Sequence, residues 1–216
     1  MIKMLLKSEL KRMRNAFYTS LFRIRKKGLN LTFGNNVMLK GCSVTQNGGG
    51  NSVIVEDGAQ LTACKFSLFG KNNRVIIHKN VRINDITFWT EDGNNLIEIG
   101  NHSSMEGQSQ LAACEGTSII IGDDCMFSNQ VNFSTTDSHA IEDLTGVRIN
   151  PAKDIQIGNH VWIGQKTLVL KGSSIADNCI VGAYSLVNKN LKDANCIYAG
   201  HPAHKVKEGI NWNRER

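Results

Sequence analysis

A six-residue repeat between residues 157 and 187 constrains the fold of this chain more than any other feature. Every sixth position in it is aliphatic: Ile157, Ile163, Val169, Ile175, Val181 and Val187. A helix repeats every 3.6 residues and a half-exposed strand every 2, so neither explains the pattern. The period fits a chain wound around a triangular prism, with one short strand and one inward aliphatic side chain per face, as in hexapeptide β-helices.

Before residue 157 the chain also repeats, but with a longer repeat length. Five similar segments begin 22 residues apart: 33–37, 55–59, 77–81, 99–103 and 121–125. A coil of three hexads needs only 18 residues, and Gly-rich polar stretches such as 48–51 and 70–73 supply the extra four at one corner. Residues 28–212 are therefore predicted to form one all-β solenoid with a continuous aliphatic core. A polar residue at Ile163 should unfold it, whereas one at Asn159 should not.

The rhythm is lost between Phe133 and Ile155. Residues 134–154 form an irregular insertion, and long insertions in regular scaffolds commonly carry function. We expect the functional side chains to gather around this segment. Residues 213–216 are expected to form a short charged tail.

Residues 1–27 are predicted to form a basic amphipathic helix. Nine Lys and Arg stand there against the single acid Glu9, whereas the rest of the chain has 16 basic and 18 acidic residues. The basicity therefore does not mark the body of the protein as a nucleic-acid binder. Two interpretations of this helix remain open, a cap on the end of the solenoid and a peripheral anchor on an anionic membrane.

The cysteines and the hydropathy favour a cytoplasmic protein. None of the six cysteines forms a C-x-x-C pair, and Cys125 and Cys179 occupy the small-residue position of the hexad, where a thiol packs as a small hydrophobe. Charged residues interrupt every apolar run near the N-terminus, so neither a secretory signal nor a membrane span is predicted. If the basic helix binds lipid, the protein would lie at the inner face of the cytoplasmic membrane.

Three motifs in the chain resemble those of a known family. They are Thr136–His139, Ile157–Gly164 and Gly200–Ala203. They resemble the hexapeptide-repeat acetyltransferases, in the branch of the maltose, galactoside and capsular-polysaccharide O-acetyltransferases. The motifs cover about residues 120–212, and residues 33–120 match only in repeat pattern. The resemblance implies a left-handed β-helix, a homotrimer, acetyl-CoA as the donor, and active sites between neighbouring subunits.

On this resemblance, His139 and Trp162 are the candidate catalytic residues. A hydroxyl is a poor nucleophile at neutral pH, and an imidazole that removes its proton contributes about 10²–10⁴-fold. Histidine suits the task because it is mostly neutral at pH 7, and either Asp137 or a carbonyl could orient its ring. Trp162 precedes the inward Ile163, so its indole should face outward, where the resemblance places it beside donor and acceptor.

The resemblance also implies a donor site along residues 157–207. The N–H near Gln165 would stabilise the charge that develops on the thioester oxygen, and cationic side chains would bind the phosphates of acetyl-CoA. The candidate donor-binding residues are Gly164, Gln165, Gly182, Ala183, Lys189, Lys205 and Lys207. The family often has lysine where this chain has His204. Arg148, Gln108 and Gln110 are the candidate acceptor-binding residues, although a structural role for Arg148 is equally open. No metal is expected.

The predicted function is O-acetylation of a sugar hydroxyl in a capsular or surface polysaccharide or its precursor. N-acetylation of an amino-sugar nucleotide, acetylation of an antibiotic, and a non-enzymatic scaffold are the alternatives. A zinc carbonic anhydrase on the same solenoid would need three histidines around the metal, and the spacing of the histidines does not provide them.

Overall fold

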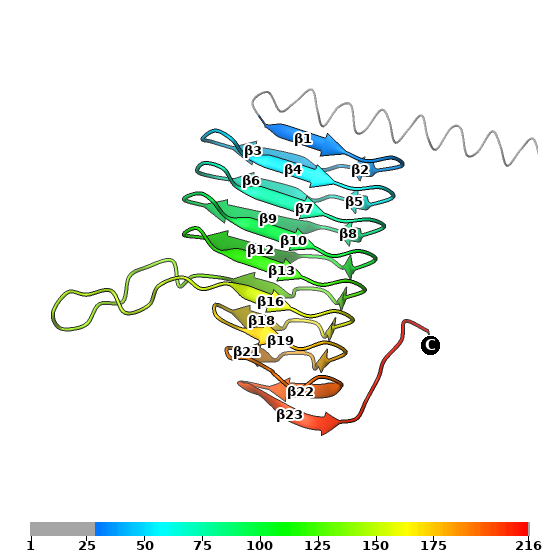
Figure 1. Ribbon diagram of the computed structural model, residues 1–216, viewed down its shortest axis with the longest axis vertical. Helices are drawn as coiled ribbons and strands as arrows, with labels where there is room; N and C mark the ends of the chain where they lie inside the picture. Colours follow the sequence, from blue (N-terminus) through cyan, green and yellow to red (C-terminus); the bar gives the residue numbers. More distant parts are fainter. Residues whose placement is uncertain (1–28, 216) are drawn as a thin grey trace, which may run out of the picture.

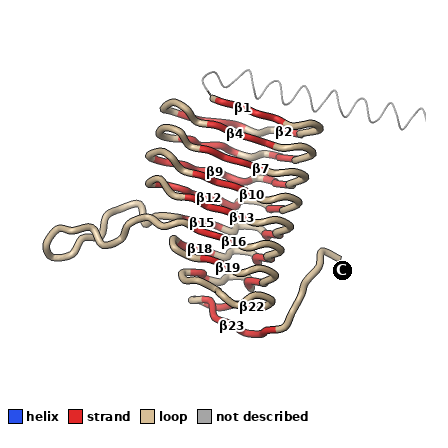
Figure 2. Tube along the Cα trace, viewed as in Figure 1, coloured by secondary structure: helices blue, strands red, loops and turns tan. Residues whose placement is uncertain are grey.

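The structure, a computed structural model, describes residues 29–215, and the helix expected over residues 1–27 lies outside them. The described chain winds as a parallel β-helix with three flat faces (Figure 1). Each turn visits three sheets in the same order, and we call these sheets A, B and C. The corners between them are loops and turns (Figure 2). The all-β solenoid predicted from the hexads is confirmed.

The strands are short and stack in register from one coil to the next. Sheet A contains β1 (Asn30–Phe33), β4 (Ser52–Val55), β7 (Arg74–Ile77), β10 (Leu96–Ile99), β13 (Ser118–Ile121), β16 (Ile155–Ile157) and β19 (Ser174–Ile175). Sheet B contains β2 (Met38–Lys40), β5 (Gln60–Thr62), β8 (Arg82–Asn84), β11 (Ser104–Met105), β14 (Met126–Phe127), β17 (Trp162–Ile163), β20 (Ile180–Val181), β22 (Cys196–Gly200) and β23 (Ala203–Glu208). Sheet C contains β3 (Ser43–Gln46), β6 (Lys65–Leu68), β9 (Ile86–Glu91), β12 (Ser109–Cys114), β15 (Asn132–Ser134), β18 (Leu168–Leu170) and β21 (Leu186–Val187).

The inward positions of the hexads form one continuous core. Ile163, Val169 and Val181 are fully buried, and Phe66 stacks on Phe88 with ring centroids 4.7 Å apart. Each fully buried aliphatic side chain contributes roughly 1.5–3 kcal/mol. The two coil lengths are also confirmed, because sheet A pairs residues 22 positions apart from β1 to β13 and 18 apart from β16 to β19.

The extra residues of the long coils lie at the corner between sheets C and A, which we call the C–A corner (residues 47–51, 69–73, 92–95 and 115–117). A ladder of buried asparagines, Asn51, Asn73 and Asn95, supports it from inside. The Oδ1 of Asn73 accepts hydrogen bonds from the backbone N–H and the Nδ2 of Asn95, at 3.1 and 2.8 Å. Its Nδ2 donates to the carbonyl of Phe69 at 2.7 Å. The ladder thus provides the hydrogen bonds that the irregular turns lack.

Replacing Asn73 with alanine should lower the free energy of unfolding by about 2–4 kcal/mol, because it leaves buried N–H and C=O groups without partners. Thermal or urea unfolding followed by circular dichroism measures the change. Arg74→Ala, at an exposed position of β7, is the control and should change stability by less than about 1 kcal/mol. Equal stability of the two variants would contradict the role of the ladder.

The cysteines are reduced side chains of the wall and core, as predicted. All six are free, and Cys125 and Cys179 are fully buried. Burial raises the pKa of the Cys125 thiol to about 12, so this group stays protonated and unreactive at neutral pH.

The C-terminal end is more ordered than the sequence indicated. The hexads fade after Val187, yet β22 and β23 form an antiparallel hairpin that continues sheet B. Beyond it, the chain folds back along the outside of sheet B (Figure 1), where Trp212 is buried and Arg214 donates to Ser104 at 2.8 Å. Residues 213–215, part of the expected short charged tail, therefore extend along one face of the solenoid. No helix within residues 29–215 has the length and apolarity to span a membrane.

Candidate active site

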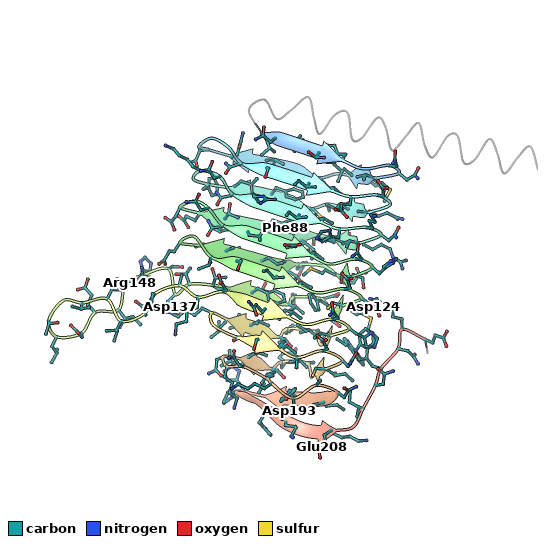
Figure 3. All side chains as sticks on the ribbon, viewed as in Figure 1. Phe88, Asp124, Asp137, Arg148, Asp193 and Glu208 are labelled. Atoms are coloured by element: carbon teal, nitrogen blue, oxygen red, sulfur yellow. The ribbon has the colours of Figure 1, made fainter. Side chains whose placement is uncertain are left out.

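The insertion predicted from the lost rhythm is an arm, residues 135–154, that projects from the C–A corner (Figures 1 and 3). Its two sides are joined by backbone hydrogen bonds, from Ile149 N–H to the Ile141 carbonyl at 2.8 Å and from Asp143 N–H to the Val147 carbonyl at 2.9 Å. Apolar side chains at the outer part are exposed, and Leu144 at the tip is fully exposed. The arm is thus an ordered hairpin that this chain alone leaves uncovered.

His139 is exposed at the base of the arm, and Asn150 holds its backbone. The Nδ2 of Asn150 donates to the His139 carbonyl at 2.9 Å and to Asp137 Oδ2 at 2.8 Å. Its Oδ1 accepts from Ile141 N–H at 2.7 Å. Asn150 is 9% exposed, so this buried carboxamide ties both strands of the arm together around the candidate base.

Asp137 does not orient the imidazole within this chain. Its carboxylate instead binds Lys171 Nζ and Asn150 Nδ2. The pKa of the Asp137 carboxyl is lowered, first by the hydrogen bond from Lys171 and then by the one from Asn150. Asp137 therefore holds the arm against the turn between β18 and β19, where Lys171 lies.

Arg148, in the arm, also forms an ion pair within this chain. Its guanidinium forms a bidentate pair with Glu115, at 2.7 and 2.9 Å, and Thr136 Oγ1 donates to the same carboxylate at 2.5 Å. These hydrogen bonds, led by those from Arg148, lower the pKa of Glu115 to about 2. Of the two roles that the sequence left open for Arg148, acceptor contact and structural support, these contacts favour the structural one within a single chain.

Replacing Asn150 with alanine should loosen the arm without unfolding the solenoid, because its four hydrogen bonds join only arm residues. Limited proteolysis with mass-spectrometric mapping should show cleavage within residues 140–149 at least about tenfold faster than in the wild type. Asn132→Ala, on the outer face of β15, is the control. Unchanged protection of the arm in Asn150→Ala would contradict this role.

Trp162 lies on the outer face of sheet B, as the alternation predicted, and is half-buried. Its ring is tilted against that of Trp212 at 6.2 Å, and Trp212 stacks on His160 at 4.1 Å. The His160 ring also contacts Asp124 Oδ2 at 2.7 Å and the Trp212 carbonyl at 2.9 Å. The returning C-terminal segment therefore forms one wall beside Trp162.

His139 and Trp162 lie on opposite sides of the prism. The arm leaves from the C–A corner, whereas Trp162 belongs to sheet B, the face opposite that corner. Figure 3 shows this separation through Asp137 on the arm and Asp124, which contacts the His160 ring on the far side. One chain does not bring the two candidate catalytic residues together.

Four candidate donor residues do come together, at the corner between sheets B and C on successive coils. A Cβ on Gly164 would lie 2.5 Å from Ala183 N, and one on Gly182 would lie 3.0 Å from Ala199 Cβ, so tight stacking of coils requires both glycines. The Gln165 carbonyl accepts from Tyr184 N–H at 2.8 Å. Its own N–H has no acceptor in the described part of the chain, which leaves a donor on the surface near Trp162.

The lysines proposed to bind the phosphates of acetyl-CoA differ in whether an acidic side chain already pairs with them. Lys205 pairs with Asp193 and Glu208 at 3.2 and 2.9 Å, and these hydrogen bonds, led by Glu208, raise its pKa. Lys189 and Lys207 are exposed, and neither forms an ion pair within residues 29–215. Lys166, which the sequence analysis passed over, lies 5.1 Å from the ring centroid of the exposed Tyr184, next to Gln165.

The two glutamines proposed for acceptor binding occupy different parts of one coil. Gln108, at the corner between sheets B and C, accepts a hydrogen bond from Gln130 Nε2 at 3.0 Å. Gln110 is exposed on the outer face of β12, and its backbone N–H donates to Asn132 Oδ1 at 3.1 Å. Gln110 alone lies on the sheet from which the arm departs.

Sequence analysis missed the residues that position the site: Glu115, Asn150, Lys171 and Trp212. Glu115, Lys171 and Trp212 act through partners 33, 34 and 52 residues away along the chain, namely Arg148, Asp137 and His160. Only Asn150 gave a signal, as a polar residue with turn propensity before Pro151 in the insertion.

Comparison with known proteins gives the same family as the motifs. The model of the bacterial transferase hexapeptide (six repeats) matches residues 154–189. A polysialic acid O-acetyltransferase of Neisseria meningitidis is 34% identical over 193 residues, which cover 79% of this chain and 89% of that protein. A polysialic acid O-acetyltransferase of Escherichia coli O1:K1 / APEC is 34% identical over 141 residues, 65% of this chain and 45% of that protein.

A solved structure matches a larger share of the chain. The polysialic acid O-acetyltransferase OatWY superposes with a TM-score of 0.84 at 32% identity, covering 88% of this chain and 89% of that one. Since a relative of this similarity is matched over nearly its full length, the chain belongs to the hexapeptide-repeat acetyltransferase family.

Proposed function

We propose that the protein is a homotrimeric O-acetyltransferase that moves an acetyl group from acetyl-CoA to a sugar hydroxyl of a capsular or surface polysaccharide. The separation of His139 from Trp162 within one chain is the observation that carries this proposal. A site that uses both residues needs two chains, and cyclic association of identical subunits supplies such a site at every interface. Its relatives named as polysialic acid O-acetyltransferases support the same reaction class and a sialic acid polymer as the acceptor.

The arm is the element that would reach the neighbouring subunit. Its exposed apolar side chains, Ile141, Leu144, Val147 and Ile149, extend outward from the C–A corner. An exposed apolar patch of this kind is stabilised when another surface covers it. Sheet B of the next protomer, with Trp162 and Gln165 near its edge, is the surface that we assign to this contact.

Each residue then has a chemical task. The neutral imidazole of His139 accepts the proton of the acceptor hydroxyl as the oxygen attacks the thioester carbonyl carbon. The free N–H of Gln165 donates to the carbonyl oxygen as it becomes negative. The proton on His139 then passes to the departing thiolate of CoA. No covalent bond to the protein forms, and the imidazole is neutral again at the end.

The donor surface fits acetyl-CoA, which supplies the activated acetyl group. At the corner between sheets B and C the small Ala183 is exposed beside Gln165, so an extended pantetheine arm could lie close to the backbone there. Lys166, Lys189 and Lys207 provide cations for its phosphates, whereas Lys205 is held by two acids.

The test is transfer of radiolabelled acetyl from acetyl-CoA to purified polysialic acid. O-linked acetyl released by mild alkali is expected. Alkali-stable label on amino-sugar nucleotides, with no label on polysaccharide, would favour N-acetylation instead. Absence of transfer to either acceptor class, from a protein that still forms trimers, would contradict the proposed function.

The basic segment 1–27 suggests a location at the inner face of the cytoplasmic membrane, because its charge of +8 is attracted to anionic lipid. Cosedimentation with phosphatidylserine vesicles at low and high salt measures this attraction. Binding that high salt does not weaken, or equal binding to neutral vesicles, would argue against it.

A further inference from the structure

The C-terminal segment after β23 packs on the outer face of the solenoid through one buried aromatic residue, Trp212. Its side chain is 6% exposed, although it lies outside the hexads and is not part of the continuous core of the prism. The rings that it meets are those of His160 and Trp162. Trp212 therefore belongs to the surface around Trp162.

Three contacts fix Trp212 on His160. The two rings stack with centroids 4.1 Å apart and planes 7° from parallel. The Nε1 of Trp212 donates to the His160 carbonyl at 2.9 Å, and the Trp212 carbonyl lies 2.9 Å from His160 Nε2. Because the ring, its N–H and the backbone carbonyl are all held by the same residue, these contacts specify one orientation of the Trp212 indole.

Arg214 holds the same segment two residues further on. Its guanidinium donates to Asp124 Oδ1 at 3.1 Å, to Ser104 Oγ at 2.8 Å and to the Cys125 carbonyl at 2.9 Å. Figure 3 shows Asp124 on the side of the prism along which this segment returns. The other Asp124 oxygen, Oδ2, lies 2.7 Å from His160 Nδ1. Desolvation opposes ionisation of Asp124, but the hydrogen bonds with His160 and Arg214 outweigh it and lower the pKa of the carboxyl. The Asp124 carboxylate thus links Arg214 to His160.

This network places a wall against one side of Trp162. The Trp162 side chain points outward from β17 and is half-buried, and the ring of Trp212 is tilted against it by 51° with centroids 6.2 Å apart. Aromatic rings attract each other at this separation. An outward side chain on a strand otherwise has several staggered rotamers open to it. Contact with an immobilised ring restricts that choice.

We infer that Trp212 is a positioning residue of the proposed active site: held by His160 and Arg214, it fixes the orientation of the Trp162 indole beside the substrates. This inference rests on the proposed function, in which Trp162 lies at the site. Trp212 itself takes no part in proton or acetyl transfer. A displacement of about 1 Å in a site can lower a rate by about 10²-fold, so a fixed indole favours turnover. The inference also assigns a function to a segment that the hexads do not explain.

A double-mutant cycle in the full-length protein, with polysialic acid as the acceptor, tests the inference. Trp212→Ala should lower kcat/KM about tenfold. Trp212→Phe keeps a ring between His160 and Trp162 and should stay within about threefold of the wild type. In a Trp162→Ala background, Trp212→Ala should have no further effect, because the ring that it positions is absent. Asn211→Ala, at the exposed neighbouring position, is the matched control and should stay within about twofold.

Fluorine NMR of the protein labelled with 5-fluorotryptophan measures the orientation of Trp162 independently of activity. The chain has three tryptophans, Trp89, Trp162 and Trp212, and single Trp→Phe variants assign their resonances. Trp212→Ala and Arg214→Ala should each shift or broaden the Trp162 resonance and leave that of Trp89, on sheet C, unchanged. Arg214→Ala is the more selective of the two variants, because it retains every aromatic ring.

An unchanged Trp162 resonance in both variants would overturn the inference, as would a loss of activity in Trp212→Ala that persists in the Trp162→Ala background. Equal losses in Trp212→Ala and Asn211→Ala would have the same consequence. If Trp162→Ala has no measurable activity, the fluorine spectra decide. Failure of the wild-type protein to transfer acetyl to any acceptor would contradict the proposed function, and the spectra alone would then show whether Trp212 orients Trp162.

Discussion

Replacing His139 with alanine should reduce acetyl transfer by about 10²–10⁴-fold, because the acceptor hydroxyl loses the base that removes its proton. The side chain is exposed at the base of the arm, and its backbone carbonyl rather than its ring is bound by Asn150. Folding and assembly should therefore be unaffected. Initial rates with radiolabelled acetyl-CoA measure the loss, and circular dichroism and sedimentation confirm the fold and the oligomer.

His78→Gln is the matched control for this variant. His78 directly follows β7 of sheet A and lies between Glu56 and Glu98, at 3.1 and 2.7 Å. Glutamine retains hydrogen-bonding capacity there, so the rate should stay within about twofold of the wild type. Retention of full activity in His139→Ala, or an equal loss in His78→Gln, would remove His139 from the mechanism.

Replacing Ile163 with aspartate should unfold the protein. The side chain is fully buried in β17, and a carboxylate there has no partner to offset its desolvation. The expected cost exceeds about 4 kcal/mol, against a total stability of roughly 5–15 kcal/mol for a typical domain. Loss of the β-sheet signal in circular dichroism, or recovery only in the insoluble fraction, is the expected result.

Gln156→Asp is the appropriate control, since Gln156 is exposed on the outer face of β16. Asn159, which looked like a neutral surface position in the sequence, is less suitable. Its Oδ1 accepts a hydrogen bond from Asp123 N–H at 2.9 Å and so joins two coils. A soluble, cooperatively folded Ile163→Asp protein would contradict the account of the core.

The core was predictable residue by residue because stacking of identical coils forces a strict period on the inward positions. Ile163 and Val181 are buried where the hexads placed them, and the break after Phe133 marks the arm. The asparagine ladder was also visible in principle, as Asn51, Asn73 and Asn95 are spaced 22 residues apart.

The contacts around the arm and the C-terminus were not predictable in the same way. Arg148 binds Glu115 and Trp212 stacks on His160, and neither pair follows the coil period. Such pairings depend on how an irregular segment folds back over a regular one, which periodicity does not encode. For the same reason the sequence left the role of Arg148 open, because its partner Glu115 could not be read from the coil period.

The most direct test of the central claim is complementation between two inactive variants. If each site combines His139 of one subunit with Trp162 of the next, a trimer that mixes His139→Ala and Trp162→Ala subunits contains one intact site. Random equal mixing should then restore about a quarter of the wild-type activity. Coexpressed mixtures that stay as inactive as either variant alone would contradict a catalytic site shared between subunits.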